Sequence, residues 1–191
     1  MPFALRGMRH GHTIFGAILR HMKSLETVPV KQYLRSTYDP DCDYVDGEVV
    51  ERPMGERDHS ELQREFILFF GNRYKKWKVF VFPEQRIQVS RTRFRVPDVC
   101  VYVGEKPREQ VLRTPPFICI EILSPEDRTS RLQQKIDDYI AFGVPHVWVV
   151  DPKTRRAWVH TREGSRQAKD ALRTETPAFE VPLAELFAAL D

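Results

Sequence analysis

Two carboxylates stand inside apolar segments of this chain, and a lysine follows on the next segment. Asp98 lies within the run 95–103 and Glu121 within the run 117–125, and both runs have the apolar residues of strands buried on both faces. A lone buried carboxylate must lose its charge or meet a cation, so two of them on neighbouring strands favour a divalent metal ion. Lys135 adds a third charged group from a segment with helical periodicity. Asp, Glu and Lys on strand, strand and helix predict metal-dependent cleavage of a phosphodiester.

The expected ligands of that ion are two carboxylates and one main-chain oxygen. Mg²⁺ prefers six oxygen ligands and usually keeps several waters, so Asp98, Glu121 and the carbonyl of Ile122 suffice once a substrate phosphate adds another oxygen. Mn²⁺ is expected to substitute for Mg²⁺. The bound ion would polarise the phosphoryl oxygen and lower the pKa of its water, while Lys135 would position that water or offset charge on the phosphate.

Each of these side chains also has a purely structural alternative. Asp98, which follows Pro97, could open its strand by accepting a hydrogen bond in a turn. Glu121 could belong to a buried ion pair, and Lys135 could lay its stem along the helix and keep its amine in water. The apolar neighbours on both sides of Asp98 and Glu121 favour the functional interpretation.

Two more residues are candidates for the site. Glu48 follows a tight turn, and His59 lies in the first turn of a predicted helix. Either would serve as an outer ligand or as a proton acceptor, and either could instead be a plain surface residue. The basic runs 91–95 and 153–156 are candidates for contacts with phosphates, although charge runs are more often solvated faces.

Composition and charge describe one ordinary globular domain. The chain has 191 residues, of which 41% are apolar and 30% charged, so we expect a single domain over residues 25–191. Residues 1–24 form a basic extension, expected either to be disordered or to precede the true start of the protein. A net charge of +3 permits a phosphate-bearing partner without demanding one.

Two absences in the sequence exclude other classes of protein. No apolar run reaches the roughly 18 residues that a membrane span needs, so no membrane partner is expected. Cys42, Cys100 and Cys119 are odd in number and lack the spacing of a zinc site. Free cysteines of this kind predict a reducing compartment, which we take to be the cytoplasm.

Periodicity and turn signals predict alternating helices and strands. The predicted elements are a helix at 28–35, a hairpin turning at Asp46-Gly47, a helix from Asp58 to about 72, strands at 79–82, 86–90, 95–103 and 117–125, a helix capped within 127–130 and ending at Gly143, a strand at 144–151, a hairpin at 153–162 that turns near Gly164, and a short helix at 183–190. The charged, proline-containing linker 104–116 is expected to be a surface loop. Strand, helix and strand over 117–151 imply a right-handed crossover between parallel strands.

Several short motifs, in their order and spacing, resemble those of the Uma-two family, restriction-endonuclease-like proteins with the PD-(D/E)XK nuclease fold that were formerly a domain of unknown function. The matching residues are Asp46-Gly-Glu48, His59, Val96-Pro-Asp98, Glu121-Ile-Leu-Ser-Pro125, Lys135 with Tyr139, Gly143-Val-Pro145 and Trp148-Val-Val-Asp-Pro152. The resemblance extends from Leu25 to His160.

The resemblance implies a fold, a cofactor and a substrate. The fold is α/β (α+β), with a mixed central sheet flanked by helices; the cofactor is Mg²⁺; and the substrate is nucleic acid, with DNA preferred. Asp98 corresponds to the family's metal-binding aspartate and Glu121 to its second acid. Leu123 stands where such nucleases usually carry a lysine, and Lys135 fits the role of a lysine that has moved to the following helix.

Two departures and two alternatives stand beside this interpretation. Arg131 replaces an acid that is frequent in the family, and His146 replaces another acid before the aromatic residue of the last buried strand. One alternative is an inactive module that keeps the fold and binds nucleic acid, and the other is a purely structural or protein-interaction domain. Since many nucleases of this fold dimerise, the resemblance also raises a homodimer as the assembly.

Overall fold

The computed structural model describes residues 27–53, 55–125 and 129–191. The predicted extension 1–24 and the predicted capping residue Asp127 lie outside these ranges. The helices are α1 (Val30–Arg35), α2 (Arg57–Gly71), α3 (Tyr74–Trp77), α4 (Thr129–Phe142) and α5 (Leu183–Ala188). The strands are β1 (Asp43–Val45), β2 (Glu48–Val50), β3 (Val79–Pro83), β4 (Ile87–Ser90), β5 (Arg93–Arg95), β6 (Val99–Val103), β7 (Ile118–Ile122), β8 (His146–Asp151), β9 (Arg156–Thr161), β10 (Gly164–Gln167), β11 (Ala171–Arg173) and β12 (Glu180–Pro182).

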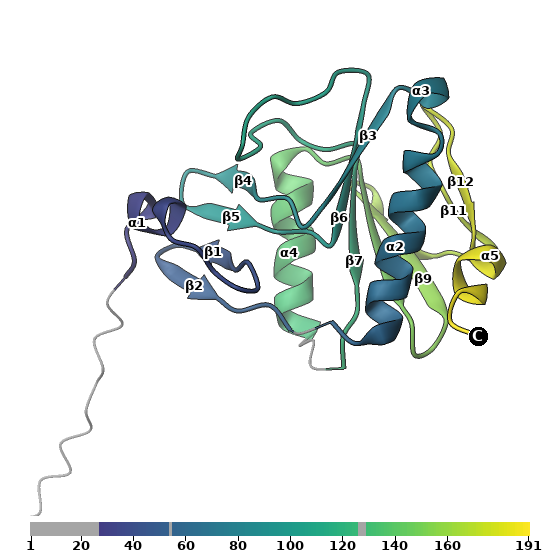
Figure 1. The fold of residues 1–191 in the computed structure, drawn as a ribbon, viewed down its shortest axis with the longest axis horizontal. Coiled ribbons are helices and arrows are strands. Elements are labelled where there is room, and N and C mark those ends of the chain that lie inside the picture. Colours follow the sequence, from purple (N-terminus) through teal and green to yellow (C-terminus); the bar gives the residue numbers. More distant parts are fainter. Residues whose placement is uncertain (1–26, 54, 126–128) are drawn as a thin grey trace, which may run out of the picture.

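A six-stranded sheet in the order β10-β9-β8-β7-β6-β3 forms the centre of the molecule. β7 and β8 are parallel and are joined through α4, whereas the other neighbours in this sheet are antiparallel. Figure 1 shows α2 and α4 packed against this sheet, whereas α1 lies away from it. The predicted mixed sheet with flanking helices is therefore confirmed.

The two faces of this sheet carry different partners. Val99 and Val101 of β6 pack with α2, α5 and the β11–β12 pair, whereas Cys100 and Tyr102 pack with α4 and β4. This alternation follows from the period-two geometry of a strand. Because β6 and β7 are buried on both faces, their interior positions are apolar. The candidate acids lie near their ends: Asp98 directly precedes β6, and Glu121 is next to the last residue of β7.

Helix α2 covers one face through residues spaced at four. Leu62, Phe66 and Phe70 are fully buried against the sheet, and the rings of Phe66 and Phe70 lie near Trp148 of β8. Burying each of these side chains contributes about 2 kcal/mol. This packing fixes the N-terminal turn of α2, which carries His59.

A second, four-stranded sheet in the order β2-β1-β5-β4 projects beside the central one (Figure 1). The continuous strand expected at 95–103 was a wrong prediction, because this run divides into β5 in the small sheet and β6 in the central sheet. Pro97 lies at the break, and proline has no amide hydrogen to donate to a ladder. The segment 96–98 is thus a connection between two sheets.

The turn residues behave as expected, with one exception. Asp46 and Gly47 both have positive φ, +49° and +104°, as a tight hairpin turn requires, and Gly143 follows α4 with φ +105°. The helix expected to begin at Asp58 begins at Arg57, and its N-cap is Glu56, whose side chain makes no capping hydrogen bond. Asp58 lies instead in the first turn, where its charge faces the positive end of the helix dipole.

The linker 104–116 is only partly a surface loop. Leu112 is buried at 2% exposure, and its main chain bonds with residues at the start of β4, through Gln88 N to Leu112 O at 2.8 Å and Leu112 N to Arg86 O at 3.0 Å. An apolar side chain anchors this predicted loop.

Among the helices that the structure describes, none has the length and apolarity to cross a bilayer.

Candidate active site

Asp98 and Glu121 meet at one end of the β6–β7 ladder. Val99 pairs with Ile120, so Asp98 and Glu121 are the next opposing residues, and their side chains point to the same face. They are only 4% and 5% exposed, and both line a cavity of about 220 Å³. The predicted convergence of the two acids is therefore what the structure shows.

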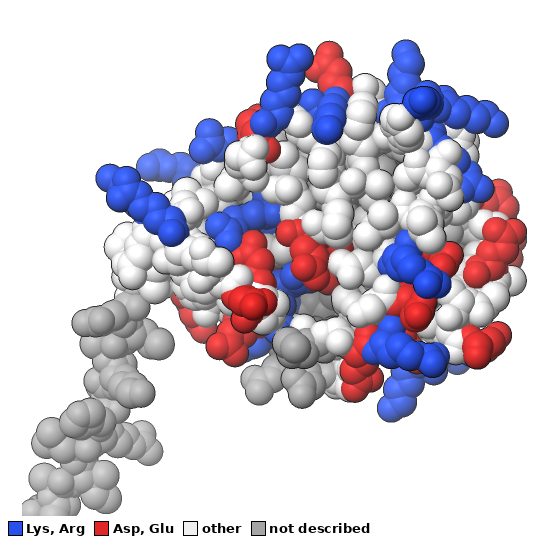
Figure 2. All heavy atoms as spheres, viewed as in Figure 1, with Lys and Arg blue, Asp and Glu red and all other residues white. Residues whose placement is uncertain are grey.

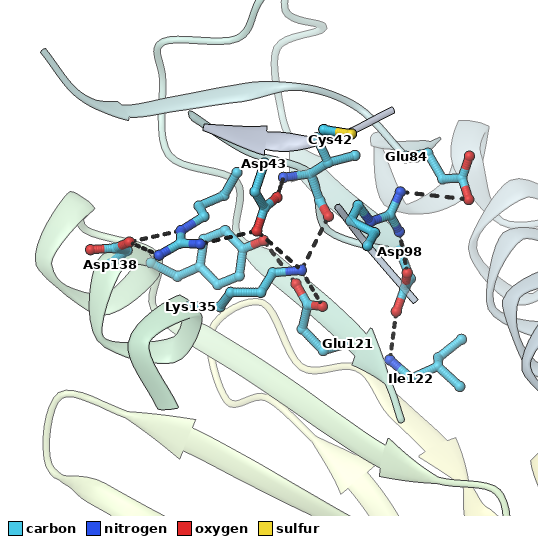
Figure 3. Close-up of polar contacts among 12 residues, drawn as sticks. Cys42, Asp43, Glu84, Asp98, Glu121, Ile122, Lys135 and Asp138 are labelled. Carbon is cyan, nitrogen blue, oxygen red and sulfur yellow. Dashed lines mark hydrogen bonds and ion pairs between the residues drawn. The ribbon is translucent and has the colours of Figure 1, made fainter. Parts of the chain in front are cut away.

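Glu121 is held by two donors from α4. Lys135 Nζ lies 2.6 Å from Glu121 Oε2, and the Tyr139 hydroxyl donates to Glu121 Oε1 at 2.8 Å. Lys135 and Tyr139 are four residues apart and therefore share one face of the helix. The Lys135 amine also donates to Val96 O at 3.3 Å, so it points into the protein, as Figure 3 shows.

Asp98 has partners on both of its carboxylate oxygens. Arg52 Nη2 donates to Oδ1 at 2.5 Å, and the amide of Ile122 donates to Oδ2 at 2.7 Å (Figure 3). His59 Nε2 lies 3.3 Å from Oδ2. The side chains of Arg52 and His59 and the main chain of Ile122 thus converge on one carboxylate.

The main chain of Asp98 is fixed as well. Its carbonyl accepts hydrogen bonds from Gln63 Nε2 of α2 at 3.0 Å and from the amide of Glu84 at 3.1 Å. Because both lone-pair directions of this carbonyl are used, the position of Asp98 is set by contacts on each side of its peptide. A metal site requires a carboxylate that is held in one position.

The two carboxylates differ in their proton affinity. Burial raises the pKa of Asp98, but the hydrogen bond from His59 and the charge of Arg52 outweigh it and lower that pKa to about 2. Burial, opposed by Lys135 and assisted by the charge of Asp98, raises the pKa of Glu121 to about 7. Asp98 is therefore ionised across the physiological range, whereas Glu121 exchanges its proton near neutrality.

Lys135 and His59 are both stabilised as cations. Burial lowers the pKa of Lys135, but the charges of Asp43 and Glu121 outweigh it and leave that pKa above its ordinary value. Burial likewise lowers the pKa of His59, and the hydrogen bond and charge of Asp98 outweigh it and raise it. The amine of Lys135 is thus an ammonium group at neutral pH.

A buried network of ion pairs and hydrogen bonds lies behind Lys135 and was not predicted from the sequence. Asp43 Oδ2 lies 3.0 Å from Arg95 Nη1 and 4.0 Å from Lys135 Nζ, and Asp43 Oδ1 accepts from the amide of Val96 at 2.8 Å. Asp138 of α4 accepts from Arg95 Nε at 2.8 Å. Asp43 lies in a short strand beside apolar residues, the same signal that identified Asp98, and could have been found by it.

The remaining predicted residues take different positions. His59 is buried at 8% exposure, so its alternative as a surface residue was wrong. Glu48 is exposed and lines the cavity at its rim. Ile122 also lines the cavity, with its amide bonded to Asp98, while the role of its carbonyl as a metal ligand stays a prediction.

The basic run 91–95 is not a continuous surface for phosphates. Arg95 is 2% exposed, and Arg93 pairs with Asp46 and Asp138. Figure 2 shows acidic and basic side chains interspersed over one face of the molecule, in keeping with 30 Lys and Arg against 27 Asp and Glu. Arg93 and Arg95 are therefore engaged by acids of the chain itself, which weakens the prediction that this run contacts phosphates.

Comparisons with known proteins agree with this arrangement. A family model described as "Putative restriction endonuclease" (Uma2) matches residues 30–190. The crystal structure of "a putative nuclease belonging to DUF820 from Anabaena variabilis ATCC 29413" is similar with a TM-score of 0.76 and 22% identity, over 84% of this chain and 98% of that chain. No curated protein matches. The solved structure shows the fold, and the family model, which spans most of the chain, shows that the protein belongs to the Uma2 family, whose description is that of a nuclease.

Proposed function

We propose that the protein is a metal-dependent endonuclease that hydrolyses phosphodiester bonds, with DNA as its substrate. The observation that carries this proposal is the shared cavity: Asp98 and Glu121 open into it side by side, and the ammonium group of Lys135 touches Glu121. Two carboxylates that face one cavity provide oxygen ligands for a divalent cation.

The donor set suits a hard divalent ion that keeps part of its water. No three His, Cys, Asp or Glu side chains gather as a ready-made metal site in the part of the chain that the structure describes. Two carboxylates, here Asp98 and Glu121, are what Mg²⁺ commonly uses when a substrate phosphate and waters complete its ligands. When bound, Mg²⁺ or Mn²⁺ would polarise a phosphoryl oxygen and lower the pKa of a water molecule.

Several side chains of the protein would then have separate roles in hydrolysis. Lys135 carries a positive charge beside the cavity and offsets the negative charge that grows on the phosphate. Tyr139 holds Glu121 in one orientation through its hydroxyl. The Nε2 atom of His59 faces Asp98 Oδ2 at 3.3 Å, so His59 orients that carboxylate rather than accepting a proton from water.

Glu48 is the better candidate for accepting a proton. It is exposed at the rim of the cavity, where a carboxylate can exchange protons with solvent. In hydrolysis, the water oxygen bonds to phosphorus, its proton passes to Glu48, and the bond from phosphorus to the sugar oxygen breaks. The departing oxygen takes its proton from solvent.

The test is cleavage of supercoiled plasmid with Mg²⁺, Mn²⁺ or EDTA. We expect nicking with either metal and none with EDTA, and a loss of about 100-fold or more in Asp98→Asn and Glu121→Gln. Glu180→Gln, an exposed change on β12, is the matched control and should cleave as the parent does. Equal nicking by all four proteins would identify a contaminant and reject the proposal, and a labelled RNA strand tested in parallel decides the substrate.

One observation favours a second candidate, an inactive nucleic-acid-binding module. The carboxylates of Asp98 and Glu121 already have cationic partners in Arg52 and Lys135. A module of this kind would bind a DNA duplex at low salt but would take up no Mn²⁺ in calorimetry. Uptake of Mn²⁺ that disappears in Asp98→Asn would exclude it.

A further inference from the structure

Arg52 occupies the site that sequence analysis assigned to a metal ion. It follows β2, its side chain is only 10% exposed, and it lines the same cavity as the two acids. Its Nη2 lies 2.5 Å from Asp98 Oδ1, whereas its Nη1 lies 3.8 Å from Glu84 Oε1, whose side chain is half exposed. Asp98 is therefore the principal partner of this guanidinium group.

The two oxygens of Asp98 are used differently. Oδ2 accepts the amide of Ile122 and faces His59, both of which belong to regular elements of the fold. Oδ1 accepts from Arg52, which lies in the segment 51–53, neither helix nor strand. The cation on Oδ1 is thus the partner that a change in this connecting segment can remove without disturbing α2 or β7.

A guanidinium group and a divalent ion compete for one buried carboxylate oxygen. Each is attracted by the same negative charge, and two positive charges at contact distance repel strongly in a buried site. The charge that Arg52 supplies is needed when Asp98 is buried without another cation, because an unpaired buried carboxylate is costly. In the protein without metal, Arg52 therefore supplies the positive charge next to Asp98 that a bound metal ion would supply in the metal-bound protein.

We propose that Arg52 is a displaceable counter-cation, which neutralises Asp98 in the protein alone and yields Oδ1 to a divalent ion when a nucleic-acid strand binds. The released guanidinium then donates to the phosphate of that strand, a partner that its planar fork of N–H groups matches. This inference rests on the proposed function, since it requires Asp98 to be a metal ligand. It assigns to Arg52 a role in both metal loading and phosphate binding.

The first experiment measures Mn²⁺ affinity by calorimetry without nucleic acid. Removing a competing cation should tighten Mn²⁺ binding to Arg52→Gln about tenfold relative to wild type, a coupling of ordinary size for two ligands that compete. Arg131→Gln is the matched control, because Arg131 lines the same cavity from an exposed position on α4 and reports the general effect of losing one nearby charge. Asp98→Asn should abolish the binding.

Thermal unfolding provides a second readout that does not depend on activity. In EDTA, Arg52→Gln should unfold at a lower temperature than wild type, because Asp98 has lost the guanidinium group that contacts Oδ1. Added Mn²⁺ should raise the unfolding temperature of the variant more than that of wild type, since the ion replaces the missing charge. If Arg52→Gln is too unstable to titrate alone, Arg52→Gln combined with Asp98→Asn should regain stability in EDTA.

The phosphate contact is tested with a short DNA duplex in Ca²⁺, which supports binding without cleavage, and in EDTA. Arg52→Gln should bind the duplex about tenfold more weakly than wild type in Ca²⁺. In EDTA the two proteins should bind equally, because Arg52 is then occupied by Asp98. A loss of equal size in both buffers would show that Arg52 contacts DNA without being released and would overturn the exchange.

The outcomes separate this inference from the proposed function. Unchanged Mn²⁺ affinity in Arg52→Gln, with binding still abolished in Asp98→Asn, rejects the counter-cation and leaves the metal-dependent nuclease standing. No Mn²⁺ binding in wild type or in either arginine variant rejects both. Binding that appears only in Arg52→Gln supports the counter-cation even where wild-type cleavage is absent.

Discussion

Lys135 Nζ lies 2.6 Å from Glu121 Oε2, and the two residues come from consecutive elements, β7 and α4. The amine reaches the acid because α4 packs on the sheet face to which Glu121 points. A lysine in this position is anchored by the carboxylate and by Val96 O, and its charge faces the cavity. This relationship links the chemistry of the site to the packing of one helix.

Replacing Lys135 by Met should reduce cleavage by about 100- to 1,000-fold, since it removes the cation that offsets charge on the phosphate. The variant keeps most of the apolar stem, so its circular dichroism should match that of wild type. Initial rates of plasmid nicking in Mg²⁺ are the measurement. Lys76→Met, on the exposed face of α3, is the control, and an equal loss in both variants would contradict a local role.

Two buried tyrosines allow the hydroxyl on Glu121 to be tested. The Tyr139 hydroxyl donates to Glu121, and the Tyr33 hydroxyl donates to Cys42 O at 2.7 Å, far from the acids in sequence. Either change to Phe should cost about 1–2 kcal/mol of the free energy of unfolding, measured with urea. Only Tyr139→Phe should also weaken Mn²⁺ binding, because Glu121 then loses its fixed orientation; equal Mn²⁺ affinity in the two variants would reject that role.

The pKa of Glu121 predicts how stability changes with pH in EDTA. Its pKa is raised by burial from 4.5 to about 7, so between these values the folded protein holds a proton that the unfolded chain has lost. That contribution to stability is complete below 4.5 and is lost as pH rises through about 7. Glu121→Gln lacks this pH-dependent contribution. Its unfolding temperature should therefore rise relative to that of wild type between about pH 5 and about pH 8.

Asp98 provides the matched change of opposite sign. Its pKa is lowered to about 2, so its contribution is complete above the ordinary value of 3.8 and is lost as pH falls toward about 2. The cost of Asp98→Asn should therefore be constant near neutrality and should shrink in acid. Parallel curves for Asp98→Asn and Glu121→Gln would show that the two carboxyls do not differ as proposed.

Asp43 should be more important for stability than its position in a three-residue strand implies. Arg95 is buried and pairs with Asp43, so Asp43→Asn leaves part of a buried charge uncompensated and should cost about 3–5 kcal/mol in urea unfolding. Asp46→Asn changes an exposed partner of Arg93 in the same hairpin and should cost less than about 1 kcal/mol. Similar costs would mean that Arg95 finds another partner.

The main layers could be predicted from the sequence, and so could Asp98, Glu121 and Lys135 of the cavity. Runs that are apolar on both faces identified β6 and β7, and the charged residue within each run identified Asp98 and Glu121, because a charge is costly to bury. Helical periodicity placed Lys135 on the inward edge of α4. These predictions needed only the local pattern of apolar residues and the free-energy cost of burying a charge.

Other parts of the site depend on contacts that no local pattern contains. Arg52 lies between β2 and α2, where there is no periodicity to show which way a side chain points. The pairing of Asp43 with Arg95 joins residues 52 positions apart. The break at Pro97 was visible in the sequence, but only the tertiary structure shows that the chain changes sheet there.

The connection of residues 96–98 has one further consequence. Within three residues the chain carries the carbonyl of Val96 that anchors Lys135, the amide of Val96 that anchors Asp43, and the carboxylate of Asp98. A tilt of the small sheet relative to the large one would pull on all three anchors together. Lys135, Asp43 and Asp98 therefore keep their relative positions only while the two sheets keep theirs.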